Sequence, residues 1–149
     1  MLSYKHFFFF LLLCSFFLSQ KIIAQNETIY TEFHTFFEKE IKFQGVKGNW
    51  IFGLNEITAY HKFDYNNDGF NDLLIEFNAT PVDEGNYTNY YAVLFKNENN
   101  KSYHFIDYVE VVDLQFINAE GELFVFQGVK NVSKVVFKLE NSKFEAFKP

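Results

Sequence analysis

The sequence predicts an α+β fold, in which an N-terminal amphipathic helix packs on a predominantly antiparallel β-sheet. Residues 27–40 have apolar side chains at helical spacing, whereas the chain beyond them carries short runs rich in β-branched and aromatic residues. Segments rich in Asn and Gly separate these runs, as is typical of strands joined by tight turns. We therefore expect one sheet, an antiparallel meander of about seven to nine strands.

The first 25 residues have the organisation of a secretory signal peptide. A short segment with one lysine precedes an apolar run over 7–18, and a more polar segment follows, with Ala24 available before a cleavage site. A membrane-spanning helix needs about 20 apolar residues, so an uncleaved anchor is the weaker alternative. We expect cleavage after Ala24 or Gln25. Residues 26–149 would then be a single secreted domain, periplasmic or extracellular, without a membrane span.

The composition of that domain excludes one class of partner. Cleavage removes Lys5 and Lys21 from the 13 basic residues, which leaves 11 against 19 acids and a formal charge of −8. The chain has no arginine, so the guanidinium groups that recognise phosphate and guanine are missing, and nucleic acid is not an expected partner. The one cysteine, Cys14, lies in the signal segment. Stability must then come from packing, with help from any bound metal.

The helix is expected over 27–40. Asn26 is a suitable N-cap and Glu27 carries a charge that is favourable in the first turn. The polar face is acidic, so the helix is expected to pack on the sheet instead of lying in an anionic membrane surface. The apolar face comprises Tyr30, Phe33, Phe37 and Ile41.

The remaining chain reads as strands. The run 90–95 is apolar on both faces, which predicts a central strand with another layer above it. The longest loop is expected over 78–88, where Pro81 and Gly85 lie. Strands are predicted at 57–63, 73–77, 90–95, 103–112, 114–118, 122–129, 134–139 and 143–147.

The stretch 64–72 is the only one with specific chemistry, because its side-chain oxygens recur at the spacing of a calcium loop. Ca²⁺ takes six to eight oxygen ligands, and positions 1, 3 and 5 of a tight turn can converge on one point. Glycine at position 6 allows the bend that turns the carbonyl of position 7 inward. The predicted ligands are Asp64, Asn66, Asp68, the Phe70 carbonyl and Asp72, with Gly69 at the bend.

The loop is not an EF-hand, because its twelfth position is Ile75 where a bidentate glutamate is required. Residues 63–75, a D-x-[DN]-x-D-G-x-x-D loop between two strands, resemble the calcium loop of FG-GAP and VCBS repeats. That resemblance covers only this stretch, and it implies calcium bound by the same five residues. Asn67 departs from the pattern, since the family usually has glycine there. The alternative is a polar turn that is rich in acids without binding metal.

No catalytic residue is predicted. His34, His61 and His104 fall in no recognisable catalytic motif. Asp107 and Asp113 flank an apolar strand and are the acids to inspect first for a glycosidase pair.

The leading functional hypothesis is a secreted calcium-binding domain, a non-catalytic interaction module with a structural Ca²⁺ and an unidentified protein or glycan as its ligand. The alternatives are a small hydrolase of the cell envelope and an inhibitor of a secreted enzyme.

Overall fold

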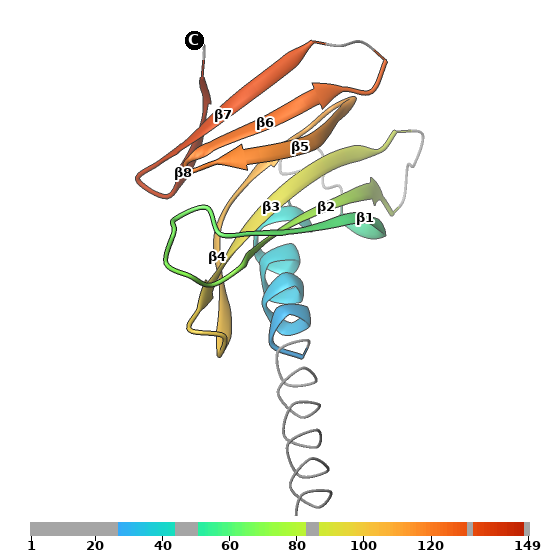
Figure 1. The fold of residues 1–149 in the computed structure, drawn as a ribbon. Helices are drawn as coiled ribbons and strands as arrows, with labels where there is room; N and C mark the ends of the chain where they lie inside the picture. The colour runs from blue at the N-terminus through green and yellow to red at the C-terminus, as the bar shows by residue number, and fades with distance from the viewer. Residues whose placement is uncertain (1–26, 44–50, 83–86, 131–132, 148–149) are drawn as a thin grey trace, which may run out of the picture.

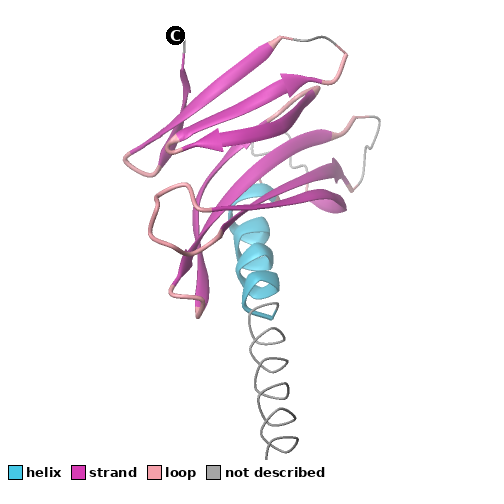
Figure 2. Ribbon diagram, viewed as in Figure 1, coloured by secondary structure: helices cyan, strands magenta, loops and turns pink. Residues whose placement is uncertain are grey.

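Two four-stranded antiparallel sheets follow one helix along the chain (Figure 1). The structure is a computed structural model that describes residues 27–43, 51–82, 87–130 and 133–147. The helix covers 27–41, and its last turn, η1 (Phe37–Ile41), is a π-helix. The strands, coloured magenta in Figure 2, are β1 (Phe52–Phe63), β2 (Asp72–Pro81), β3 (Asn89–Glu98), β4 (Ser102–Glu110), β5 (Leu114–Glu120), β6 (Leu123–Gly128), β7 (Lys134–Glu140) and β8 (Lys143–Phe147).

The helix lies where the apolar spacing over 27–40 predicts it. It is therefore within the chain and not at the N-terminus of the sequence. Its final turn widens, because the Lys42 N–H donates to the Phe37 carbonyl at 2.9 Å, five residues back. The predicted apolar face needs one correction. Phe36 is buried in the core, whereas the Tyr30 side chain is 67% exposed. Phe37 and Ile41 are buried in the helix-side core, as predicted.

The expectation of a single sheet was wrong. The strand orders are β1-β2-β3-β4 and β5-β6-β7-β8, so each sheet is a meander in itself. The chain leaves the first sheet in a turn after β4, where the Leu114 N–H donates to the Val111 carbonyl at 3.3 Å and Asp113 takes a positive φ of 54°. This turn places β5 over the first sheet instead of beside β4 (Figure 1). Because side chains alternate identically in a strand that extends a sheet and in one that starts a second layer, periodicity could not distinguish the two.

The first sheet is the middle of three layers, and its faces bury two separate apolar clusters. One face of β2 and β3 packs against the helix, and the other packs against the second sheet. The 90–95 run is therefore central, as predicted. The helix-side cluster includes Phe33, Phe36, Ile75, Phe77, Val93 and Phe95. The cluster between the sheets includes Leu74, Leu94, Phe116, Phe124, Phe126 and Leu139.

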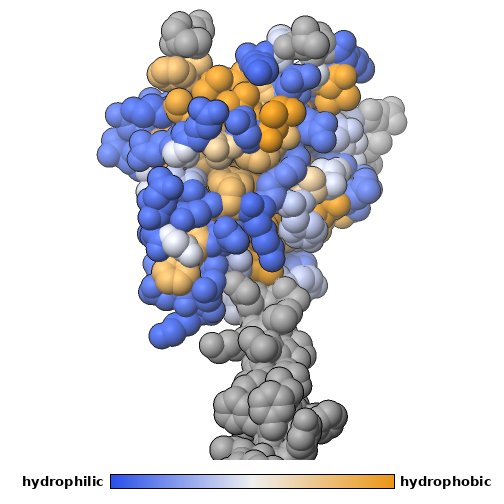
Figure 3. Space-filling model, viewed as in Figure 1, coloured by the Kyte–Doolittle hydropathy of each residue, from blue (hydrophilic) through white to orange (hydrophobic). Residues whose placement is uncertain are grey.

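The expected 78–88 loop is shorter than predicted. β2 continues to Pro81, and Asn78 and Ala79 pair with Tyr90 and Asn89 of β3. The partner strand thus keeps residues extended that turn chemistry alone favours as a loop. On the surface, apolar side chains gather over the second sheet while most of the remaining face is hydrophilic (Figure 3).

Candidate functional site

The predicted calcium loop connects β1 to β2. The last pair of the β1–β2 ladder is Phe63 with Asp72, so two hydrogen-bonded strands hold both ends of the loop, as predicted. Within it, Asn67 and Gly69 adopt positive φ values of 57° and 87°. Glycine enters this region without strain, and asparagine tolerates it better than most residues. The left-handed conformation at Asn67 gives a physical reason why either asparagine or glycine suits position 4.

The structure brings Asp64, Asn66 and Asp68 together around the backbone of the turn. The Asp68 N–H donates to Asp64 Oδ1 and to Asn66 Oδ1, both at 3.1 Å. Asp64 Oδ2 accepts the Gly69 N–H at 2.8 Å, and Asp68 Oδ1 accepts the Phe70 N–H at 3.0 Å. An ionised carboxylate has about four lone-pair sites, so each group keeps acceptor capacity for a cation.

Asp72 also braces the base of the loop. Its side chain is fully buried, and its two oxygens accept the N–H groups of Tyr65 at 3.2 Å and Asn97 at 2.8 Å. Burial raises the pKa of Asp72; the two N–H bonds oppose this rise, and the negative charges of Asp68 and Asp64 add to it. Asp72 is thus close enough to Asp64 and Asp68 for their charges to raise its pKa, and its hydrogen bonds tie the loop to the end of β3.

The negative charge of the loop has little compensation in the described part of the chain. Asp68 Oδ2 accepts a hydrogen bond from the Asn66 amide at 2.9 Å and lies 3.8 Å from Lys96 Nζ. Among the described residues, no group of three or more His, Cys, Asp or Glu side chains is placed to hold a metal ion. Besides carboxylates, the predicted ligand set includes the amide oxygen of Asn66 and the carbonyl oxygen of Phe70.

The histidines have partners that the sequence did not reveal. His61 Nε2 lies 2.7 Å from Glu76 Oε2, and the other Glu76 oxygen accepts the Phe116 N–H at 2.9 Å. Glu76 is on β2 and Phe116 is on β5, so this buried carboxylate joins the two sheets. His104 Nε2 is 3.1 Å from Ser102 Oγ and 3.4 Å from an exposed Glu98 carboxylate. His34 lies against the Tyr30 ring, with 4.5 Å between centroids.

The two acids singled out for a glycosidase pair have structural partners. Asp107 is buried, and its oxygens accept from Lys143 Nζ at 3.0 Å and from the Phe144 N–H at 2.7 Å, which ties β4 to β8. Hydrogen bonding to Asp107 and its charge raise the pKa of Lys143. Asp113 is exposed and lies 3.6 Å from Lys130 Nζ.

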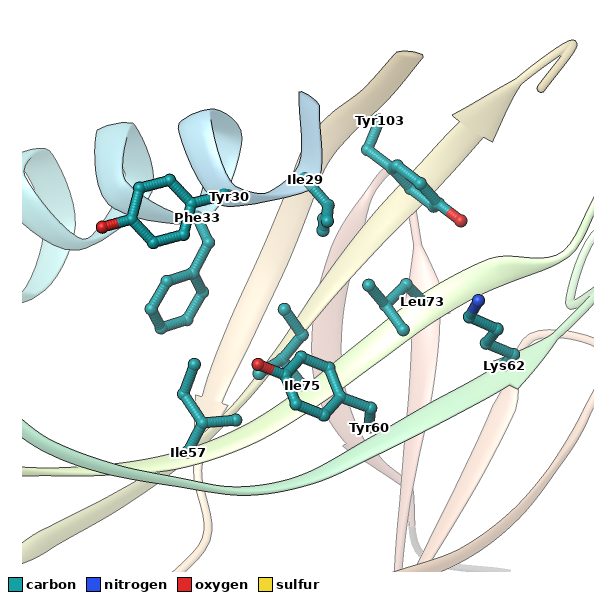
Figure 4. A pocket seen from close by; sticks show the side chains of 9 residues that line it. All are labelled: Ile29, Tyr30, Phe33, Ile57, Tyr60, Lys62, Leu73, Ile75 and Tyr103. Atoms are coloured by element: carbon teal, nitrogen blue, oxygen red, sulfur yellow. The ribbon is translucent and has the colours of Figure 1, made fainter. Parts of the chain in front are cut away.

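Sequence reasoning missed two pockets that flank β1. A pocket of about 300 Å³ is lined by Glu76, Tyr90 and Asp113 among others. A second pocket, of about 350 Å³, lies between the helix and the first sheet, and it is lined largely by apolar and aromatic side chains (Figure 4). The only local signal was a break in the alternation of β1, which coincides with two irregularities in its register.

The predicted signal peptide lies outside the described residues, so cleavage after Ala24 or Gln25 stays a prediction. Among the residues that the structure describes, no helix has the length and hydropathy needed to cross a membrane. Comparison with protein-family models, with curated proteins and with solved structures found no match. The resemblance of 63–75 to FG-GAP and VCBS loops therefore also stays a prediction.

Proposed function

We propose that the protein is a secreted, non-catalytic binding module whose β1–β2 loop binds one structural Ca²⁺. The observation that carries this proposal is the gathering of Asp64, Asn66 and Asp68 oxygens around one turn between two strands. Oxygen donors of this kind suit a hard cation, and calcium accepts irregular geometry better than magnesium. The ligands proposed are Asp64, Asn66, Asp68, Asp72 and the Phe70 carbonyl.

The carboxylates of the β1–β2 loop are suitable ligands for Ca²⁺. Three carboxylates lie within one short loop, Lys96 is 3.8 Å from one of them, and the fully buried Asp72 carries a raised pKa. A divalent cation would neutralise the mutual repulsion of these acids and so favour the ionised form of Asp72. The expected gain is one of stability, since the loop joins two strands of the central sheet.

The test is a melting experiment in calcium and in chelator. Extracellular calcium modules bind with dissociation constants of roughly 10⁻⁴ to 10⁻³ M. At ten times that concentration, binding to the native state alone adds about 1.4 kcal/mol, which raises the melting temperature by a few degrees. Magnesium at the same concentration should do less, because it demands octahedral geometry and sheds water reluctantly.

Two substitutions in the same turn make a matched pair. Asp68→Ala removes a proposed ligand, together with the acceptor for the Phe70 N–H, and should abolish the calcium-dependent rise. Asn67→Gly keeps the positive φ and the proposed ligand set, and should preserve the rise. Equal melting temperatures in calcium and chelator, together with no calcium in metal analysis of the untreated protein, would refute the site.

One observation favours the alternative of a small hydrolase, namely the 2.7 Å contact between His61 and Glu76 beside a pocket. Both Glu76 oxygens are already engaged by His61 and the buried Phe116 N–H, which favours a structural role. We expect His34→Ala, His61→Ala and His104→Ala to retain whatever activity an assay of the protein reveals. Loss of turnover in one of these variants, with unchanged circular dichroism, would support the hydrolase instead.

A further inference from the structure

The pocket between the helix and the first sheet has an apolar floor and an aromatic mouth. Phe33, Leu73 and Ile75 line it and are almost fully buried, at 3%, 3% and 1% exposure. Tyr30 of the helix and Tyr60 of β1 also line it, and they are 67% and 60% exposed. A hollow of about 350 Å³ with this apolar and aromatic lining has the size and character of a small-molecule site.

A bulge in β1 builds this pocket. The ladder pairs Ile57 with Phe77, then shifts by one residue, and pairs Tyr60 with Ile75 and Lys62 with Leu73. Directly paired residues of antiparallel strands project from the same face, so the shift turns Tyr60 and Lys62 toward the helix side. Regular alternation from Ile57 would have placed Ala59 and His61 there instead.

The bulge also gives the pocket Lys62, the one charged side chain among the described residues that line it. In Figure 4, the Lys62 ammonium and the Tyr103 hydroxyl lie at the same end of the pocket, and Ile57 and Phe33 lie toward the other. None of the ion pairs within the described part of the chain involves Lys62. Within the described ranges, Lys62 is therefore a cation without a carboxylate partner, at one end of an apolar hollow.

We propose that this pocket binds a small amphipathic carboxylate, whose apolar chain lies over Phe33 and Ile75 and whose anionic group pairs with Lys62. The charge of the lining selects an anion over a cation. Its floor of Phe33, Leu73 and Ile75 favours an acyl chain over a sugar, because sugar hydroxyls placed against these apolar side chains would lose their hydrogen-bonding partners. Tyr60 and Tyr30 then cover part of the chain from the solvent side.

This inference rests on the binding role proposed above and names a ligand class for it. Its side chains are separate from the calcium ligands, so either proposal can fail without the other. Calcium-dependent melting tests the loop, whereas carboxylate binding tests the pocket.

The experiment is isothermal titration calorimetry of the protein, as purified after export, with decanoate below its micelle-forming concentration. Decanol probes the need for the charge, and glucuronate probes a sugar acid in place of an acyl acid. Lys62→Met keeps most of the apolar stem and removes the ammonium, and Lys134→Met makes the same change at an exposed site on β7. Methyl NMR shifts of Ile29, Ile57 and Ile75 locate the bound ligand.

We expect decanoate to bind wild type and Lys134→Met equally, and Lys62→Met about tenfold more weakly, as loss of one charge-assisted contact implies. Decanol should bind wild type about as weakly as decanoate binds Lys62→Met. The methyl shifts should change in all three isoleucines. The proposal is overturned by absence of decanoate binding, by equal binding to Lys62→Met, by equal binding of decanol, by glucuronate binding as tightly as decanoate, or by unchanged isoleucine methyls.

Discussion

Glu76→Ala should destabilise the protein strongly, because Glu76 is a buried link between the two sheets. Its Oε1 accepts the Phe116 N–H at 2.9 Å and its Oε2 contacts His61 at 2.7 Å, while the residue is only 6% exposed. Alanine leaves a buried N–H on β5 without an acceptor, which costs about 1–3 kcal/mol. Loss of the buried side-chain methylene adds about 0.8 kcal/mol, and relief of the buried charge offsets part of the total. We expect a net loss of about 2–3 kcal/mol.

Glu76→Gln is the matched control. The glutamine amide oxygen can accept the Phe116 N–H, and its shape is almost that of glutamate, so only the charge-assisted part of the two contacts is lost. We expect a loss of about 1 kcal/mol for this variant. Glu145→Ala, an exposed substitution on β8, should change the free energy of unfolding by less than about 0.5 kcal/mol.

Urea unfolding followed by circular dichroism measures these differences. With a slope of about 1–3 kcal/mol per molar, a loss of 2–3 kcal/mol moves the midpoint by about 1 M or more. A Glu76→Ala protein within 0.5 kcal/mol of wild type would show that the carboxylate does not join the sheets. Equal losses for Glu76→Ala and Glu76→Gln would mean that charge, and not the acceptor for the buried N–H, is what matters.

Three further predictions can be checked separately. Phe36→Ala should lower the free energy of unfolding by about 3–5 kcal/mol, because Phe36 is 2% exposed and packs among four aromatic rings of the sheet. Urea unfolding measures this loss, and a loss below about 1 kcal/mol would contradict the packing. Burial raises the pKa of Tyr91 and Tyr103 above 10.0, so the stability that these two groups contribute is complete below pH 10 and is lost as pH rises through the folded-state pKa. The urea midpoint should therefore fall above pH 10. Phenolate absorbance that appears at the ordinary pKa, without unfolding, would contradict the raised pKa of these tyrosines. Intact-mass measurement of the exported protein should give an N-terminus at Gln25 or Asn26, whereas retention of the first residues would show that the segment is not cleaved.

Much of the local structure was predictable from the sequence alone. The helix near 27–40, the positions of most strands and the turn at Gly69 follow from side-chain periodicity and backbone preference, which act within a few residues. The gathering of Asp64, Asn66 and Asp68 belongs to the same class, because a single turn holds all three.

Contacts between distant residues decided the rest. The turn at Asp113 and the apolar surface of β2 that β5 could bury decided that β5 covers the first sheet instead of extending it. Neither feature can be inferred from the alternation of side chains along a strand. The pairing of His61 with Glu76 and the rotation of Lys62 toward the helix both depend on one extra residue in β1, whose position is set by the register with β2. Register is a property of two strands together, so the pocket and the link between the sheets emerge only in the tertiary structure.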